Sequence, residues 1–456
     1  MMLDEMENEA MVKIDVLNDS RVTRKTSSFV FWNRARTFIM ILSLICLTLS
    51  QINSLTFTFT VICMEDVVEE HHRTNQTGLH FMESNSHKSM LFSGTAVGAM
   101  LGLVPSVPLI ARFGPRNILT LSGMISAFGS LLFPIAVSLH YYLVFFCRVL
   151  QGIGISTIFT AVAVIPVVWS PNNEMGTFLA VLSCALQGGS VICMAVSGVL
   201  CTSTFGWRSI YYIFGIATFF SYIVFFFSYK DTPHVHRNVS EKELSHIQTG
   251  KIKTKGREPV PYRAIVSDPC VITCLISVFG GNLGFFILVL YGPTYLKNAL
   301  GFDVEKTGFA SSFSFFLSAV AKIIAGQISD RMDYVSEKTR FIMCAAVSQV
   351  GMAAGYLVIM AITEDPTIAQ IAYSFAIVCS GINVMGTVKC LQLRCRQHVH
   401  FGISVVSFTA KCYSISAQFA LLFYIIAGII IIANIPFPFL STAKPGFLCL
   451  SRNFQR

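Results

Sequence analysis

Residues 148–174 read RVLQGIGISTIFTAVAVIPVVWSPNNE, and this stretch decides how the rest of the chain is interpreted. It places one cation, Arg148, in an otherwise apolar helix that ends in a Trp-x-Pro turn and the acid Glu174. An arginine at the centre of a membrane helix costs about 2.5–3.5 kcal/mol on insertion scales, so it normally faces the interior of a helix bundle or a water-filled cavity. Because its charge is positive, we expect Arg148 to contact an anion.

The composition indicates a membrane protein. Of the 456 residues, 54% are hydrophobic and only 12% are charged, about half the charged share of an ordinary soluble domain. The net charge of +9 lies in short segments between apolar runs, which does not suggest a nucleic-acid partner. The fourteen cysteines are scattered without any CxxC pair, so we expect packing residues and neither a disulfide framework nor a metal site.

Apolar runs long enough to cross about 30 Å of hydrocarbon follow one another along the chain. They lie near 37–64, 89–111, 117–138, 141–168, 176–200, 209–229, 269–297, 306–328, 341–362 and 367–388. Basic segments stay in the cytoplasm, which places both the amino terminus and the long central loop there. The predicted fold is therefore all-α and polytopic.

This pattern divides the chain into two bundles that repeat one another. The predicted parts are a cytoplasmic tail (1–36), a first helix bundle (37–229) with a glycosylatable loop (65–88), a central cytoplasmic loop (230–268), a second bundle (269–434) and an atypical tail (435–456). No short apolar segment with a cleavage site precedes the first span, so we expect no signal peptide. Two repeated bundles are typical of a secondary transporter with its site near the midplane, although periodicity alone leaves a receptor or channel open.

Polar residues in the membrane runs are candidates for the walls of a substrate path. Asn53 and Ser54 lie in a hydroxyl- and amide-rich half of the first run, and Gln151 follows Arg148 by one turn. Hydrogen bonding between helices and a polar wall on a substrate path are equally good interpretations of the first run. In the next span, Gly94, Gly98 and Gly102 recur every four residues and predict close helix packing.

The loop 65–88 contains the sequon Asn75-Gln76-Thr77 and four histidines. Because this loop lies outside the cytoplasm in the predicted topology, Asn75 is the expected glycosylation site. Loop histidines without a helical pair are usually solvated, so we expect no metal there.

The chain resembles the major facilitator superfamily, and within it the anion transporters of solute carrier family 17. The superfamily loop signature Gly-x-x-x-Asp-Arg is present as Gly326 to Asp330-Arg331, and a reduced first-half copy runs from Arg112 through Gly114 to Arg116. Other similar features are Arg148-Val149-Leu150-Gln151-Gly152, Trp169-Ser170-Pro171 with Glu174, Gly206-Trp207-Arg208, and the turn from Gly301-Phe302 to Thr307-Gly308.

The resemblance implies that the two loops act as conformational latches. The first latch, in the first half of the chain, would contain Gly114 and Arg116. The second latch would contain Gly326, Asp330 and Arg331. Each would hold two helices together in one state and release them in another. Ala111 stands where the first-half copy should have its acid, so we expect the first latch to be weakened.

Other positions depart from what the resemblance implies. Thr56, Phe92, Ile155 and Gly281 stand where the glutamate and sialic acid carriers have ionisable residues. With no intramembrane carboxylate or histidine to relay protons, a sodium site built from hydroxyls and carbonyls, or facilitated movement, is easier to reconcile with this sequence. Lys322 is expected to be a boundary residue that reaches the cytoplasm. After residue 411 there is no room for two more full spans.

Together these patterns predict a secondary transporter that moves a small inorganic or organic anion by alternating access, with symport as one mode. Arg148, Gln151, Asn53 and Ser54 are the candidate binding residues; no cofactor is expected, and Na+ or H+ is the candidate coupling ion. The alternative is a transport-incompetent scaffold or sensor of the same shape. No nucleophile–base pair or phosphate loop indicates an enzyme. A monomer in the plasma membrane or in an intracellular vesicle membrane is expected.

Overall fold

The computed structural model describes residues 34–73, 80–171, 174–248, 268–331, 335–361, 365–383, 386–387, 390 and 428–440. Most of these residues are helical, and none of them forms a β-strand, as the all-α prediction requires.

The long helices follow the apolar runs of the sequence, and short polar helices lie between them. In the first half they are α2 (Ala35–Thr60), α3 (Glu65–Arg73), α4 (Asn85–Phe113), α5 (Pro115–Leu139), α6 (Tyr141–Ser156), α7 (Ile158–Trp169), α8 (Met175–Thr202), α9 (Gly206–Ser228), the 3-10 turn η1 (Pro233–Val235) and α10 (Glu241–Gln248). In the second half they are α12 (Pro269–Asn298), α13 (Val304–Arg331), α14 (Glu337–Ala361), α15 (Pro366–Asn383) and α19 (Phe437–Leu440).

Nine helical segments in the described part of the chain are long and apolar enough to cross a membrane. They correspond to the first nine expected spans, and α6 with α7 makes up one of them, interrupted at Thr157. The tenth expected span is α15, which is not among the nine. The predicted tail boundary at 434/435 falls inside a shorter apolar helix, Gly428–Phe439. The chain is therefore a polytopic helical protein.

The chain divides into two compact units whose boundaries cut across the helices. The first unit holds Met1–Ser54, Val97–Gly189 and Tyr211–Pro259, and the second holds Leu55–Ala96, Ser190–Ile210 and Val260–Arg456. The second unit thus joins the ends of α2, α4 and α8 to the helices of the second half.

In the first unit, glycines allow α4 and α6 to approach closely. A Cβ atom on Gly98 would overlap the backbone carbonyl of Val149, and one on Gly102 would overlap the Ser156 side chain. Hydrogen atoms at these positions let the two helices come together, which confirms the predicted packing role of Gly98 and Gly102. The remainder of this core is aliphatic and aromatic, with Trp169 and Tyr222 among its buried side chains.

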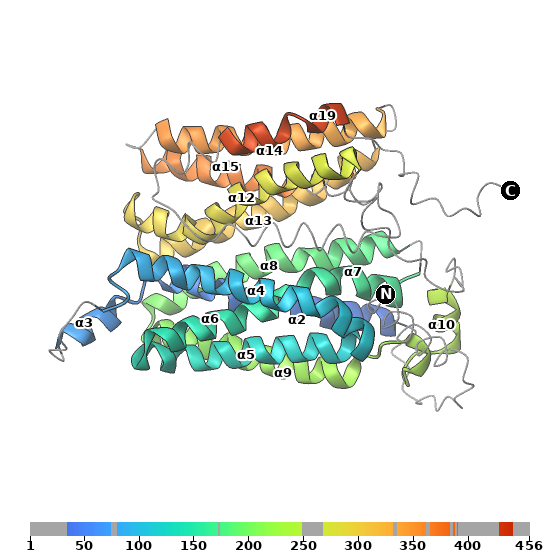
Figure 1. The fold of residues 1–456 in the computed structure, drawn as a ribbon, viewed down its shortest axis with the longest axis horizontal. Helices are drawn as coiled ribbons and strands as arrows, with labels where there is room; N and C mark the ends of the chain where they lie inside the picture. The colour runs from blue at the N-terminus through green and yellow to red at the C-terminus, as the bar shows by residue number, and fades with distance from the viewer. Residues whose placement is uncertain are drawn as a thin grey trace. The chain divides into compact units, whose positions relative to one another are not determined.

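In the second unit, the long helices α12 to α15 run side by side (Figure 1). The helix formed by residues 428–439 packs against α12, where Gly280 faces Ala433 and Gly284 faces Ile430. Asn434 and Ser277 are also hydrogen-bonded to each other. Although the sequence after residue 411 departs from the expected pattern, this part of it contributes a packed helix.

A disulfide joins Cys63, just beyond α2, to Cys201 near the end of α8, with 6.1 Å between the two Cα atoms. The expectation that the cysteines serve only as packing residues is therefore wrong for this pair. The two residues are 138 positions apart in sequence, and only the folded arrangement of α2 and α8 brings them together. Nine other cysteines in the described ranges form no disulfide.

Candidate transport site

Arg148 is fully buried in the first unit, on the second turn of α6. Its Nη1 atom donates to the Ser54 carbonyl oxygen at 3.2 Å and to Gln151 Oε1 at 2.6 Å. Gln151 is three residues further along α6, so helical geometry places its amide beside the guanidinium. The cation is thus held between α6 and the middle of α2.

Hydrogen bonds extend this arrangement to α5 and α9. Gln151 Nε2 donates to Ser130 Oγ at 3.1 Å. Asn53 Nδ2 donates to Thr218 Oγ1 at 3.0 Å and to Ser126 Oγ at 3.4 Å. We call this set the first polar cluster: Asn53, Ser54, Ser126, Ser130, Arg148, Gln151 and Thr218. The four binding residues predicted from the sequence all lie in it.

Arg148 gives this cluster a positive charge that no acidic residue of the surrounding helices balances. None of the sequences of α2 and α4 to α9 contains an aspartate or glutamate. Their contribution around Arg148 consists of hydroxyls, amides and carbonyls. A buried guanidinium in such surroundings attracts an anion, since charge interactions are stronger at low local dielectric.

A second polar cluster lies in the second unit and was missed by the sequence analysis. Gln349 Nε2 on α14 donates to Asn383 Oδ1 at 3.2 Å and to the Ser277 carbonyl oxygen at 3.4 Å. Thr387 Oγ1 bonds to the same Asn383 oxygen at 2.9 Å. We define this cluster as Ser277, Gln349, Asn383 and Thr387. Its side chains carry no charge, and single amides in apolar runs give no signal that they will meet.

Gly281 on α12 stands where the resemblance implies an arginine, and the two amides of this cluster lie beside it. A Cβ atom at Gly281 would overlap Gln349 Nε2 and would lie 2.9 Å from Asn383 Nδ2. The two amides occupy the space that a longer side chain would need.

Lys322 on α13 differs from its expected role. It is only 7% exposed, so it is a buried residue and not a boundary residue that extends into solvent. Ser314 and Ser318, eight and four residues earlier, are buried as well. Helical spacing places the three on one polar stripe.

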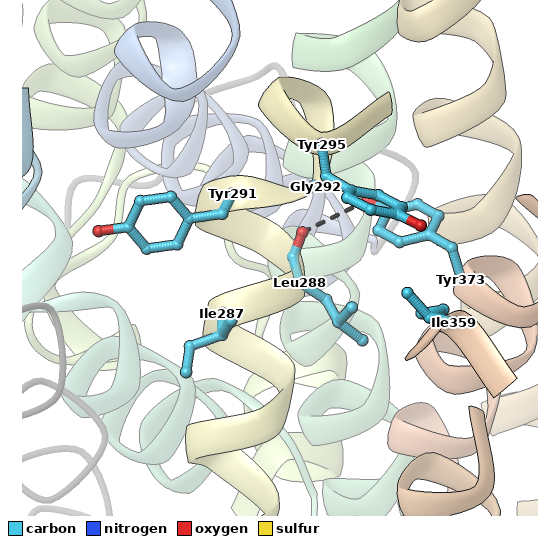
Figure 2. Close-up of a pocket in the computed structure, with 7 residues that line it drawn as sticks. All are labelled: Ile287, Leu288, Tyr291, Gly292, Tyr295, Ile359 and Tyr373. Carbon is cyan, nitrogen blue, oxygen red and sulfur yellow. Dashed lines mark hydrogen bonds between the residues drawn. The ribbon is translucent and has the colours of Figure 1, made fainter. Parts of the chain in front are cut away.

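A small cavity of about 10 Å³ lies beside α12, with room for about one water molecule. Figure 2 shows Tyr295 and Tyr373 on one side of α12 and Tyr291 pointing the other way. The Tyr373 hydroxyl donates to the Leu288 carbonyl oxygen at 3.3 Å. This cavity is too small for a polyatomic anion.

Tyr291 belongs to a cluster of tilted aromatic rings that includes Phe92, one of the residues that differ from what the resemblance implies. Its ring centre lies 5.2 Å from that of Phe92, which in turn lies 5.1 Å from that of Phe57. Where the resemblance implies a second-helix histidine, this chain therefore packs aromatic rings.

The first latch contains a carboxylate that the sequence analysis did not assign. Gly114 has a positive φ of 84°, which favours glycine, and a Cβ atom there would overlap the Asp231 carboxylate. Asp231 Oδ1 accepts from the Arg116 backbone amide at 2.8 Å, and Arg116 Nε donates to the Phe226 carbonyl oxygen at 2.6 Å. Asp231, which follows α9, thus supplies an acid to the loop where Ala111 supplies none.

The charges around this loop are perturbed by burial. Burial raises the pKa of the Asp231 carboxyl above its usual range, opposed by the Arg116 amide and by the positive charges of Arg116 and Lys230. The pKa of Lys230 is lowered by burial and by Arg116, with Asp231 opposing. In both residues, burial therefore favours the neutral form of the side chain.

For the proposed second latch, the structure describes only the backbone of the two charged residues. Asp330 and Arg331 are the last two residues of α13, and Gly326 lies one turn earlier and is half-buried. The positions of the Asp330 and Arg331 side chains, and Asn75 as a whole, lie outside the described residues.

A further set of contacts joins the two halves of the chain within the second unit. Lys297 Nζ on α12 donates to the Ile62 carbonyl oxygen at 2.6 Å and to Glu65 Oε1 at 2.5 Å. Gly198 and Gly308 allow α8 and α13 to approach closely, and Ser312 Oγ donates to the Val191 carbonyl oxygen at 3.0 Å. The segment just after α2 therefore contacts α12, and α8 contacts α13.

Apolar helices of spanning length, with a buried cation among polar groups, define a polytopic membrane protein. The family model described as Major Facilitator Superfamily matches residues 39–417. The chain belongs to this superfamily, and it is an integral membrane protein of the plasma membrane or of an intracellular vesicle.

Curated relatives place the chain near the solute carrier family 17 transporters. It is 27% identical over 282 residues to mouse sodium-dependent phosphate transport protein 1, covering 59% of this chain and 60% of the relative. It is 26% identical over 266 residues to human sialin, covering 58% and 53%. The chain thus matches little more than half the length of these relatives.

Solved structures confirm the fold. The xylose transporter XylE from E. coli, in a partially occluded inward-open conformation, matches with a TM-score of 0.67 at 14% identity, covering 88% of this chain and 97% of that one. A bacterial homologue of the human lysosomal transporter Spinster matches with a TM-score of 0.62 at 12% identity, covering 83% and 79%.

Proposed function

We propose that this protein is a secondary transporter that moves a small anion by alternating access, with Arg148 as the anion contact. The observation that carries the proposal is the position of Arg148: a fully buried guanidinium inside the first polar cluster. The curated relatives are supporting context, since one is named for phosphate transport and another is sialin.

The cluster has the donors that an anion needs. Arg148 presents a planar fork that matches the oxygens of a phosphate or carboxylate. Asn53 on α2 and Gln151 on α6 carry side-chain amides in the same cluster. An arriving anion would compete with Gln151 Oε1 and the Ser54 carbonyl for the guanidinium, and charge-assisted bonds are about twice as strong as neutral ones.

Alternating access requires contacts that exist in one state and break in another. The bonds of Lys297 to Glu65 and to the Ile62 carbonyl are suited to this role, because they connect the two halves of the chain near loop 65–88. On the predicted cytoplasmic side, Arg116 with Asp231, and Asp330 with Arg331, are the proposed latches.

Sodium is the coupling ion we favour. The first polar cluster offers hydroxyl, amide and carbonyl oxygens, and the helices that form it contain no acid that could relay protons. Sodium symport then requires only oxygen ligands, whereas proton symport requires a titrating group.

The test is uptake into proteoliposomes of radiolabelled phosphate, glutamate and sialate, with sodium or proton gradients imposed separately. We expect uptake of one anion class, driven by the sodium gradient, and loss of that uptake in Arg148→Ala. Arg237→Ala, which changes an exposed arginine outside the helices, should transport like the wild type.

Two results would contradict the proposal. A folded wild-type protein that moves none of these anions under either gradient would argue against transport. Uptake that survives in Arg148→Ala would remove the anion-contact role. A proton-driven signal would leave transport standing and would overturn only the choice of sodium.

A further inference from the structure

Three buried cysteines meet in the second unit, at the beginning of α12. Cys270 and Cys274 lie one helical turn apart on α12, and Cys390 comes from the segment after α15. Their sulfur atoms all lie within 4.8 Å of one another, and all three residues are buried. Neither the proposed transport role nor the disulfide uses them.

The spacing of these sulfur atoms fits a shared metal ion. Metal–sulfur bonds are about 2.3 Å long, so three sulfurs arranged in a plane around one metal lie about 4.0 Å apart. The observed limit of 4.8 Å is close to this value. Small side-chain rotations would bring the three thiols to a common centre. We propose that Cys270, Cys274 and Cys390 form a binding site for copper(I).

The donor set selects a soft monovalent ion. All three donors are sulfur, and thiolates favour Cu(I), zinc and iron–sulfur clusters. Structural zinc almost always has four ligands. In the part of the chain that the structure describes, no histidine, carboxylate or further cysteine joins this group. Copper(I) is satisfied by two or three sulfurs and needs no fourth ligand.

The surroundings favour a bound cation over thiolates without a metal. Val271, Val278, Phe341, Ala345 and Phe437 enclose the thiols in an apolar shell, in which an isolated thiolate would be costly. One Cu(I) ion balances the charge of one thiolate, and each metal–sulfur bond further reduces the negative charge on its sulfur. The amino-terminal end of α12 adds to the effect, because Cys270 is its second residue and helix N-termini stabilise thiolates.

Binding exchanges thiol protons for the metal. Each coordinating thiol releases its proton to solvent as its sulfur bonds to Cu(I), and no electron is transferred. The bound ion would connect α12 to the segment that contains Cys390. Phe341 of α14 and Phe437 of α19 pack against the same cluster, so occupancy would stiffen this end of the second unit.

The test uses the purified full-length protein in detergent, reduced and kept free of oxygen. Copper(I) is supplied as its complex with the coloured chelator bicinchoninate, and transfer to the protein is followed by loss of colour. We expect one equivalent per wild-type chain, and loss of this transfer in Cys274→Ser and Cys390→Ser. Cys379→Ser should bind like the wild type, because Cys379 is a buried thiol of α15 outside the group.

Copper X-ray absorption on the wild-type protein provides a measurement that does not depend on the folding of any variant. A shell of two or three sulfur atoms is expected. A shell containing nitrogen or oxygen would overturn the proposal. So would a wild-type chain that takes no copper from the chelator, or a Cys274→Ser protein that takes as much as the wild type.

Discussion

Each half of the chain contains a polar cluster among its helices, but only the first cluster contains a charged side chain. In the first, Arg148 bonds to Gln151 and to the backbone of Ser54. In the second, the amide of Gln349 donates a hydrogen bond to the amide oxygen of Asn383. The first cluster is therefore the one suited to attract an anion, whereas the second contains only neutral groups.

The strongest test of the comparison fills the space that keeps the second cluster neutral. In Gly281→Ala, the added methyl group would overlap the Gln349 amide and displace it from Asn383. Overpacking of this kind costs about 1–3 kcal/mol, so we expect a clear fall in the midpoint of thermal unfolding in detergent.

Gly188→Ala is the matched control for this change. Gly188 lies within α8 and has no neighbouring atom within 4 Å of an added Cβ. Because alanine is favoured over glycine in helices by about 1 kcal/mol, the control should be as stable as the wild type or more so. Equal losses in both variants would show that Gly281 has no special role.

A second prediction contrasts the central residues of the two clusters. Gln349→Leu leaves the Ser277 carbonyl without the amide donor and costs Asn383 one hydrogen bond, so we expect a loss of about 1–3 kcal/mol in unfolding free energy. Arg148→Met removes a donor from Gln151 but also removes a buried charge, and these two effects oppose each other.

We therefore expect thermal unfolding to be changed less by Arg148→Met than by Gln349→Leu. A larger loss for Arg148→Met would mean that the guanidinium serves mainly to hold α6 against α2. In that case the first cluster would be structural, as the second one is.

The smallest expected effect concerns Asp231, the half-buried carboxylate beside Gly114 and Arg116 in the first unit. Because the pKa of Asp231 is raised in the folded state, the folded protein binds this proton more tightly than the unfolded chain does. The contribution of Asp231 to stability therefore falls as pH rises from its usual pKa through its raised value. Asp231→Asn keeps an oxygen acceptor for the Arg116 amide and removes this titration.

We expect the wild type to lose stability relative to Asp231→Asn as pH rises above about 4, the ordinary pKa of an aspartate side chain. Thermal unfolding of both proteins across this range measures the difference. Parallel curves would show that Asp231 titrates as it does in the unfolded chain.

Much of the fold was predictable because a membrane-spanning helix can be recognised from the length and apolar composition of one continuous segment. Length and apolar character gave nine of the ten expected spans, and the glycine spacing gave the close approach of α4 to α6. The first polar cluster was also predictable in outline, since a lone Arg148 in an apolar helix must find polar partners. Its role in binding an anion stays a prediction.

What the sequence did not reveal depends on contacts between distant residues. Cys63 and Cys201 are 138 positions apart, and Arg116 and Asp231 are 115 apart. Gln349 meets Asn383 only when α14 packs against α15. In each case the residue types are ordinary, and the information lies in the packing of whole helices, which short-range patterns do not contain.

The bond between Cys63 and Cys201 also has a consequence for how the protein is oriented. Structural disulfides persist in the oxidising spaces outside the cell or inside secretory compartments, and are rare on the cytosolic face. We therefore expect the ends of α2 and α8 that carry Cys63 and Cys201 to face away from the cytosol. Loop 65–88 follows directly from Cys63 and lies on the same side. The count of lysines and arginines gives the same orientation, by a principle that makes no use of sulfur chemistry.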